Sequence, residues 1–556
     1  MIHLQKIVFP EQYDTSGQLY YRSEQPLPAM GEGSLIIPRA RLTFDTYCNM
    51  FSLQTWKRHT LIRNIFLDVV FKGNCTIRLY SLRVDNTAEL LEEYIFNKKE
   101  PHKALIPFPE TDAQALYWSL EPEDDFELHE AWYVTDTPEA EVREINLAVV
   151  FCTFKREDYI RHNVSMFAKL AVEYPEMADK VRLHIVDNGR TLVAEDFPET
   201  DVALYANPNV GGAGGFARGM LEVLDTGGAT HVLLMDDDIY LLPESLFRTF
   251  TFLRLCKESF REYFIGGAML DLLRPNMQHE SVAGFSKSKL LVNLHFDLDL
   301  TDREACLLND APVDIRDMRM YQAWWYCAMP VQSIREYGFP YPFFVRQDDI
   351  EFSIRQSANI LYLNGICVWH EPFYKKDNNF TTYLYLRNML VFSALYPETA
   401  LDYVIVWKLW IREFVQASFT ANYAKAFSLA EAVEDFLRGP EFLSNPRTGE
   451  ATLKKQAKNK GEIQPLATFK DEFLPDNLDT LSEAAPCGII NKILCVITLN
   501  GLLLLPSCRK GRGIVLLGKK NQLKNYRGCK KFCVIGQSCY PDYRRIDDGR
   551  PQRYTR

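Results

Sequence analysis

The sequence predicts an α/β fold: a doubly wound, mostly parallel sheet with a β module before it and helices after it. Three observations predict it. Strand-like alternation fills the first 144 residues, buried strands alternate with helices from residue 145, and helical periodicity takes over after residue 395. The chain has 556 residues, enough for about three domains. With 47% hydrophobic and 24% charged residues, it is neither a disordered nor a collagen-like protein.

Residues 1–144 are predicted to form a β-sandwich or jelly-roll-like module. Residues 64–73 and 74–84 alternate apolar and polar side chains and are separated by Gly73-Asn74, which is typical of strands joined by a turn. Prolines punctuate the remainder, and helical periodicity is scarce. An all-β module is the simplest fold consistent with this pattern.

Residues 145–395 are predicted to form the α/β domain. INLAVVFCTF at 145–154 is a continuous apolar run, as expected for a strand buried on both faces. Asp158 is a candidate cap for the helix that follows. Three further strands are expected in VRLHIVDNG, VALYANPNV and THVLLMDDD. Ligands of such a sheet collect at the carboxyl ends of its strands.

A helical domain is predicted over 396–507, with Gly439-Pro440 ending its main helical stretch. The apolar segment 488–505 contains Asn491, Lys492 and Asn500, so a buried or interfacial helix fits better than a membrane span. Residues 508–556 form a basic tail, with 14 Lys and Arg against 3 Asp and Glu. Such a tail is either a solvated end or a contact for an anionic membrane or an acidic partner.

Charge and cysteine usage limit the possible functions and compartments. The net charge of −10 argues against a nucleic-acid-binding protein. The first seven of the 13 cysteines lie in apolar surroundings and are expected to be reduced core residues. Cys529, Cys533 and Cys539 leave a zinc site in the tail conceivable, although a four-ligand pattern is missing. The N-terminal residues do not resemble a signal peptide, so a cytosolic location is expected.

Three consecutive carboxylates follow the fourth predicted strand of the α/β domain. Asp236 and Asp238 can turn toward one point while Asp237 points away, because alternate residues at a strand end share a side. Carboxylate oxygens are the ligands that Mg²⁺ and Mn²⁺ prefer, and such an ion can bridge a diphosphate. The alternative is a simple turn, where Asp is common. Metal binding is the better interpretation.

Polar side chains also follow the other predicted strands of this sheet. CTFKR supplies Thr153 and Arg156, VDNG supplies Asp187 and Asn188, and PNVGGAGG supplies Asn209 with four glycines. Glycine allows backbone to approach a ligand, and amides at a helix N-terminus attract phosphate. Each turn alone is weak, but together they predict a nucleotide site along one rim of the sheet.

Further candidates lie downstream. Asp348 and Asp349 either begin a helix or supply a catalytic carboxylate. Trp324 and Trp325 are expected in a strand, one in the core and one beneath a sugar, although both could be core residues. His370 follows an apolar strand and is either structural or a third metal ligand.

These motifs, in this order, resemble the family-two galactofuranosyltransferases of the galactan-polymerising type, which have the GT-A fold of nucleotide-diphospho-sugar transferases. The resemblance includes FDTYCNMFSLQTWKRHT at 44–60 in the β module. It continues through TFKR, VDNG, NVGGAGGFARGM, MDDDI, HESVAG, WW, QDDIEF and VWH to YLYLRNMLV at 383–391. It covers most of residues 40–395 and, more loosely, the helical region.

The resemblance implies a role for each matched residue. The expected UDP contacts are Thr153, Arg156, Asn188, Asn209, Asp236 and Asp237. The expected metal ligands are Asp236, Asp238 and His370, with Asp349 as general base. The expected acceptor-site residues are Glu280, Trp324, Trp325 and Asp348. Two positions depart from the family pattern: Asn188 replaces an expected glutamine, and Tyr385 replaces a histidine.

The implied function is inverting transfer of galactofuranose from UDP-galactofuranose to a glycan or lipid-linked glycan, with Mn²⁺ or Mg²⁺, in cell-wall or surface polysaccharide synthesis. A homo-oligomer at the inner face of the plasma membrane is expected, with peripheral membrane contact through the helical domain and the tail. One alternative is a family-two transferase that uses a pyranose sugar such as galactose or rhamnose, and another is an inactive glycan-binding protein. A nucleotidylyltransferase would need a Gly-rich loop with a basic residue near the N-terminus, where the β module stands instead.

Overall fold

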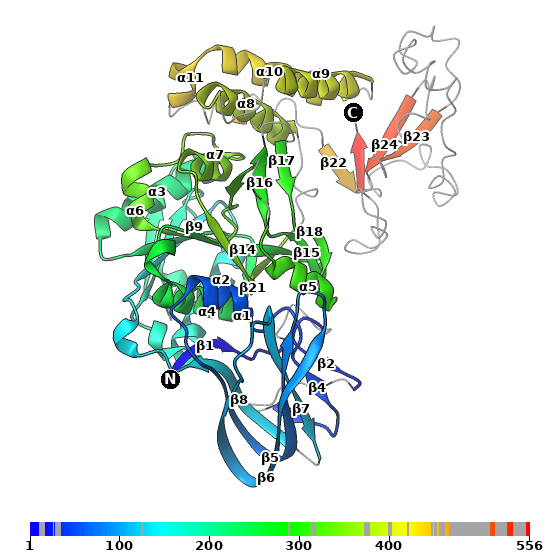
Figure 1. The fold of residues 1–556 in the computed structure, drawn as a ribbon. Coiled ribbons are helices and arrows are strands. Elements are labelled where there is room, and N and C mark those ends of the chain that lie inside the picture. Colours follow the sequence, from blue (N-terminus) through cyan, green and yellow to red (C-terminus); the bar gives the residue numbers. More distant parts are fainter. Residues whose placement is uncertain are drawn as a thin grey trace. The chain divides into compact units, whose positions relative to one another are not determined.

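The computed structural model describes residues 1–445 except for 11–16, 26, 28–34, 124–125, 199, 287–289, 314, 316–317, 372–378, 398–402 and 420–421. Beyond residue 445 it describes 449, 453–454 and four short strands. The chain divides into two compact units, residues 1–372 and 373–556 (Figure 1). The expected domain boundaries at residues 144, 395 and 507 stay predictions.

The first unit begins with an antiparallel N-terminal β module in which the strand order is β1-β8-β5-β7-β4-β2, with β3 added to β8 and β6 to β5 (Figure 1). Alternate side chains of the long strand β5 are buried, as its sequence pattern predicts. The turn expected at Gly73-Asn74 is wrong, because both residues lie inside this continuous strand. A short helix, α1 (Leu53–His59), lies within the module. The strands are β1 (Ile2–Lys6), β2 (Arg22–Ser23), β3 (Leu35–Ile37), β4 (Leu42–Thr43), β5 (Ile65–Leu82), β6 (Ala88–Pro107), β7 (Ala115–Pro122) and β8 (Phe126–Thr135).

The second sheet confirms the predicted α/β core. Its four leading strands are parallel in the order β11-β10-β9-β12, and the order continues through β20, β14, β15 and β18. Strand β21 runs parallel to β14 and also pairs antiparallel with the short strand β13. The strands are β9 (Leu147–Thr153), β10 (Val181–Asp187), β11 (Val202–Ala206), β12 (His231–Asp236), β13 (Ile239–Leu241), β14 (Phe264–Asp271), β15 (Arg274–Glu280), β18 (Phe296–Asp299), β20 (Cys327–Pro330) and β21 (Ile360–His370).

Helices connect these strands, and a three-stranded sheet in the order β17-β16-β19 accompanies them. The predicted cap Asp158 is instead the second residue of α2, because the helix begins at Glu157 and Arg156 occupies the N-cap position. The helices are α2 (Glu157–Glu173), α3 (Gly211–Thr226), α4 (Pro243–Leu255), α5 (Arg303–Asp310), α6 (Val331–Tyr337) and α7 (Asp348–Arg355). The small strands are β16 (Ala283–Ser286), β17 (Leu290–Asn293) and β19 (Arg319–Tyr321).

The hydrophobic core explains why β9 and β12 are apolar along their whole length. Side chains of both strands are buried, and they share a cluster with Phe216 and Met220 of α3 and Phe352 of α7. Burying a side chain of this size contributes about 1.5–3 kcal/mol, so this cluster fixes α3 and α7 on the sheet. The N-terminal ends of both helices are thereby held near the rim where the parallel strands end.

Helix α4 joins the N-terminal β module to the second sheet. The Glu244 carboxylate accepts a hydrogen bond from the Lys6 amide at 2.9 Å and pairs with Arg248 at 3.4 Å. The Arg248 guanidinium donates to the carbonyl oxygens of Cys48 in the module and Asn364 in β21, at 3.0 and 2.5 Å. This buried ion pair therefore has hydrogen-bond partners both in the N-terminal β module and in β21.

The second unit contains helices and a four-stranded sheet in the order β22-β25-β24-β23. The helices are α8 (Asn379–Leu395), α9 (Tyr403–Phe419), α10 (Tyr423–Leu437) and α11 (Pro440–Ser444). The strands are β22 (Glu462–Pro465), β23 (Arg512–Leu517), β24 (Lys531–Gly536) and β25 (Gln552–Thr555). Helix α10 ends just before Gly439-Pro440, as predicted, and Pro440 begins α11.

Two sequence predictions about the C-terminal region lie outside the described residues. One concerns the apolar segment 488–505, and the other a zinc site at Cys529, Cys533 and Cys539, of which the structure describes Cys533 in β24. Among the helices that the structure describes, none is long and apolar enough to cross a membrane. The seven cysteines before residue 372 are thiols, and all but Cys152 are buried, as predicted.

Candidate active site

The parallel strands bring the predicted rim residues together. Asp187 at the end of β10 is in register with Thr153 at the end of β9, and Asp236 at the end of β12 is in register with Cys152. Neighbouring strands lie about 4.8 Å apart, so these side chains begin within one or two strand spacings of each other. The rim is therefore continuous across three strands.

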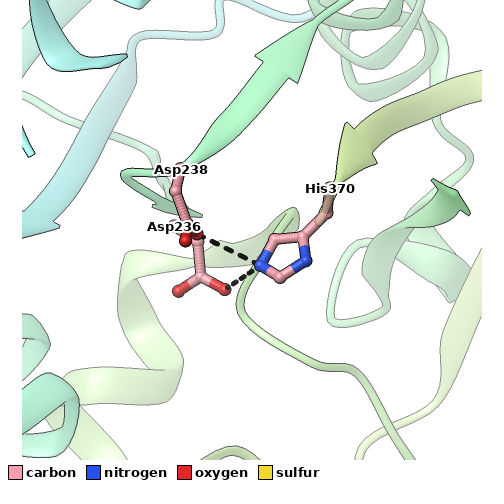
Figure 2. Close-up of side chains that lie close together, drawn as sticks. All are labelled: Asp236, Asp238 and His370. Atoms are coloured by element: carbon pink, nitrogen blue, oxygen red, sulfur yellow. Dashed lines mark ion pairs between the residues drawn. The ribbon is translucent and has the colours of Figure 1, made fainter. Parts of the chain in front are cut away.

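Asp236, Asp238 and His370 form a cluster that can hold a metal ion, with one ligand atom from each within 4.8 Å of the others. The Nε2 atom of His370 is 3.1 Å from Asp238 Oδ1 and 3.8 Å from Asp236 Oδ2 (Figure 2). Strand pairing explains the meeting, because Ile239 of β13 is in register with His370 of β21. Asp238 and His370, which are 132 positions apart in the sequence, are thus brought together by one short ladder.

The orientation of the imidazole fits metal binding. Nδ1 of His370 lies 2.6 Å from the carbonyl oxygen of Glu371, which favours the proton on Nδ1 and leaves the Nε2 lone pair toward the two carboxylates. His370 is 1% exposed, whereas Asp236 is more open. Two carboxylates and one imidazole suit Mn²⁺ or Mg²⁺ with positions left for water or phosphate oxygens.

Two neighbouring residues modify the charge of this cluster. Arg156 Nη2 lies 3.8 Å from Asp238 Oδ2, so a half-exposed guanidinium stands beside the carboxylates. Asp237 points away, as predicted, and its Oδ2 accepts a hydrogen bond from the Phe154 amide at 3.2 Å. Burial, followed by the charge of Asp238, raises the pKa of Asp237 to about 7. Asp237 therefore ties the end of β12 to the turn after β9.

The two predicted asparagines hold the glycine turn that begins α3. Asn188 donates from Nδ2 to the Gly211 carbonyl oxygen at 2.9 Å and accepts from Asn207 Nδ2 at 2.8 Å. Asn209 Oδ1 accepts from the Gly211 amide at 3.1 Å. Sequence reasoning missed Asn207, although its place in the Asn207-Pro208-Asn209 turn was a usable signal. Their roles as UDP contacts stay predictions.

Thr153 differs from these asparagines. It is 2% exposed, and its side chain opposes the rise in the pKa of the neighbouring Asp237 carboxyl.

The acidic pair Asp348 and Asp349 lies in the first turn of α7, as predicted. The charge of Asp236, a member of the metal cluster, acts on both carboxyl groups. Burial and, in the same direction, the charge of Asp236 raise the pKa of Asp349 to about 6, while the Ile350 amide, at 2.8 Å from Asp349 Oδ1, opposes the shift. Burial and the charge of Asp349 raise the pKa of Asp348 well above its ordinary value. Burial and the charge of Asp349 also raise the pKa of Glu280 to about 8. Asp349 therefore lies within electrostatic reach of Asp348 and Glu280, and Asp236 lies within reach of Asp348 and Asp349.

The tryptophan pair lies in a turn before β20 rather than in the expected strand. Both side chains are 4% exposed. Trp324 packs edge-to-face on Phe216 and Phe352, and Trp325 donates from Nε1 to the Gly267 carbonyl oxygen at 2.8 Å. Trp324 is therefore a core residue, and an acceptor role for either one stays a prediction.

Sequence comparison gives the same class of protein as the motifs. Residues 4–136 match the family described as Galactofuranosyltransferase 2 N-terminal, which confirms the resemblance of the β module. The chain is 26% identical over 438 residues to Galactofuranosyltransferase GlfT2 of Mycobacterium tuberculosis, covering 73% of this chain and 66% of that protein. It is 26% identical over 433 residues to Galactofuranosyltransferase GlfT2 of Mycolicibacterium smegmatis, covering 73% and 65%.

The chain therefore spans just under two thirds of the length of the curated relatives it matches. Among solved structures, S. aureus TarS 1–349 is 11% identical, with a TM-score of 0.31, and the match covers 57% of this chain and 80% of that one. That score is too low to carry weight. The GT-A-type assignment follows from the strand order and from the acidic cluster at the strand ends.

Proposed function

We propose that this chain is an inverting, metal-dependent glycosyltransferase that moves galactofuranose from UDP-galactofuranose to a hydroxyl group of a glycan or lipid-linked glycan. The observation that carries the proposal is the meeting of Asp236, Asp238 and His370 within electrostatic reach of the half-buried acid Asp349. Similarity to named galactofuranosyltransferases supports the sugar and the donor class.

Asp236, Asp238 and His370 would hold the Mn²⁺ or Mg²⁺ ion. When bound, such an ion neutralises negative charge on the diphosphate of the donor. Arg156 would add a second positive charge on the same side, because its guanidinium already lies beside Asp238. Thr153, Asn188, Asn209 and Asp237 would line the nucleotide side.

Asp349 would act as the general base. Its carboxylate accepts the proton of the acceptor hydroxyl while that oxygen bonds to the anomeric carbon, and the bond from this carbon to the diphosphate oxygen breaks. One displacement inverts the configuration without a covalent intermediate. A pKa of about 6 leaves Asp349 mostly ionised at neutral pH and still basic enough to take the proton.

Glu280 would complement this base on the acceptor side. With a pKa of about 8, its carboxyl is mostly protonated at neutral pH and can donate a hydrogen bond to a sugar oxygen. Asp348, Trp324 and Trp325 would shape the remainder of the acceptor site. Self-association, a cytoplasmic location and peripheral membrane contact belong to the same proposal.

The deciding experiment compares sugar nucleotides. The full chain with Mn²⁺ is incubated with UDP-galactofuranose, UDP-galactopyranose or dTDP-rhamnose and a panel of glycan acceptors, and released nucleotide and product mass are measured. We expect a mass increase of one hexose from UDP-galactofuranose. Equal or faster transfer from a pyranose donor would contradict the assigned sugar, and absence of transfer from every donor would contradict the enzymatic proposal.

A further inference from the structure

The segment just before the acidic pair has an unusual backbone. Phe344, Arg346 and Gln347 all have positive φ angles, of 73°, 73° and 65°. Residues with side chains rarely adopt this region, and three within four positions is a concentration of strain. Gln347 is followed at once by Asp348 and Asp349, so the strained loop 344–347 sets where α7 and its carboxylates begin.

The surroundings of Gln347 indicate that contacts from outside the loop impose its conformation. Its side chain is 3% exposed, and neither amide atom has a hydrogen-bond partner among the described residues. Its carbonyl oxygen accepts from the Glu351 amide at 2.9 Å, which starts the helix. A buried, unsatisfied amide and left-handed residues persist only where surrounding structure imposes them.

The glycine turn at the start of α3 supplies such an external contact. The Ala213 amide donates to the Phe344 carbonyl oxygen at 3.0 Å. Gly211 has φ of +73°, and a Cβ atom there would lie 2.1 Å from that same oxygen. Because the obstructing atom is backbone, no side-chain movement could relieve the overlap. Only glycine at 211 allows the loop to approach this closely.

The neighbouring glycine and the amide hydrogen bonds distinguish this role from phosphate binding. A Cβ at Gly212 would meet Val345 at 3.6 Å and Asp348 at 3.8 Å, which are ordinary contacts. The Gly211 amide is bonded to Asn209 and the Ala213 amide to Phe344, so two of the amides expected to face phosphate are already occupied by protein.

We propose that Gly211 is a positioning residue: its turn clamps the strained loop 344–347 and thereby sets the place of Asp348 and Asp349 opposite the metal cluster. Asn188, which donates to the Gly211 carbonyl oxygen, anchors the clamp to the nucleotide side of the rim. The catalytic consequence rests on the proposed role of Asp349, whereas the clamp itself does not.

The test substitutes Gly211→Ala in the full chain. We expect hydrogen exchange of the segment 343–352 to accelerate, and kcat for transfer to fall about 100-fold, since a displacement of about 1 Å can cost this much. The dissociation constant for UDP with Mn²⁺, measured by calorimetry, should change less than about threefold, which a phosphate-binding glycine would not allow.

Three further variants serve as comparisons. Gly227→Ala has a similar φ of +71° with nothing within 4 Å of its Cβ, so it measures backbone strain without the clash. Gly212→Ala adds a Cβ beside the clamp and should lose far less transfer than Gly211→Ala. Ala213→Pro removes the amide donated to Phe344 at a helix position that tolerates proline, and should reproduce the loop exchange if Gly211→Ala does not fold.

The outcomes separate the two proposals. Unchanged hydrogen exchange of residues 343–352 in both Gly211→Ala and Ala213→Pro would overturn the clamp. A loss of UDP affinity in Gly211→Ala as large as the loss in kcat would also overturn it. Accelerated exchange with undiminished transfer would support the clamp and contradict the catalytic role of Asp349.

Discussion

Asp349 is distinguished from other helix-starting acids by its surroundings. It is half-buried, and its burial together with the charge of Asp236 raises its pKa to about 6. Many acids in a first turn are simply stabilised there by the helix dipole. Asp158 in α2 is such an acid, and its fully exposed side chain pairs only with Arg161 of the same helix among the ion pairs described. Asp349 and Asp158 thus occupy the same position in their helices but differ in burial and in neighbouring charge.

We expect Asp349→Asn to lower transfer by about 10²–10⁴-fold, because the amide cannot accept the hydroxyl proton. UDP binding with Mn²⁺ should remain, since Asp349 is not among the clustered metal ligands. Steady-state kinetics and calorimetry on the same preparation measure both. Asp158→Asn, an acid in an equivalent helix turn, should retain full activity. Loss of nucleotide binding in Asp349→Asn would contradict its assignment as base.

Asp238→Ala tests the metal cluster. Asp238 Oδ1 is 3.1 Å from His370 Nε2, so removing the carboxylate leaves one carboxylate and one imidazole. We expect Mn²⁺-dependent UDP binding to weaken at least about tenfold, because second-sphere changes alone already cost that much at metal sites. Calorimetric titration of UDP with and without Mn²⁺ measures it. An unchanged titration would show that the nucleotide binds without this carboxylate.

For single residues, the sequence could identify the acids and the histidine as candidate ligands, because the residue type alone shows their chemistry. It could not identify the left-handed backbone at Phe344, Arg346 and Gln347, since that conformation depends on contact with a turn about 130 residues earlier. The assignment of the glycines of that turn to phosphate binding stays a prediction.

Helix α4 shows how a single element secures two parts of the first unit. Arg248 pairs with Glu244 and donates to backbone on both sides of the junction. We expect Arg248→Ala to lower the free energy of unfolding by about 3 kcal/mol, because it strands Glu244 in the interior. Urea denaturation measures the change.

A matched control comes from the same helix. Arg254 pairs with the exposed Glu139, so Arg254→Ala should cost less than about 1 kcal/mol. The double variant Glu244→Gln with Arg248→Met should be more stable than Arg248→Ala alone. If Arg248→Ala were no worse than Arg254→Ala, the junction would not depend on this pair.

Elements were predictable where one local signal dominated. Continuous apolar runs identified β9 and β12, because a strand covered on both faces admits nothing else. The tryptophan pair was wrongly expected in a strand, since aromatic residues favour strands locally while packing against Phe216 and Phe352 holds them in a turn.

For the molecule as a whole, buried carboxyl groups set the response of stability to pH. Asp310, which is 8% exposed, lies where α5 meets α1 and accepts a hydrogen bond from Thr55 at 3.1 Å; burial raises its pKa to about 7. A raised folded-state pKa favours the protonated form. Its contribution to stability is therefore complete below pH 3.8 and is lost as the pH rises toward 7.

We expect the free energy of unfolding to fall between about pH 4 and 7, and Asp310→Asn to remove up to about 4 kcal/mol of that fall, as three pKa units imply. Denaturant unfolding at several pH values measures it, with Asp158→Asn as an exposed control. The wild-type and Asp310→Asn curves should converge near pH 4. Parallel curves across this range would mean that Asp310 does not titrate as proposed.

The ladder between β13 and β21 has a consequence for how the chain can vary over time. Ile239 faces His370 across a pairing only three residues long, and a one-residue slip would present Trp369 or Glu371 in place of the imidazole. Substitutions that keep this register leave Asp238 and His370 together, whereas the insertion or deletion of one residue between Asp238 and Leu241 would separate them.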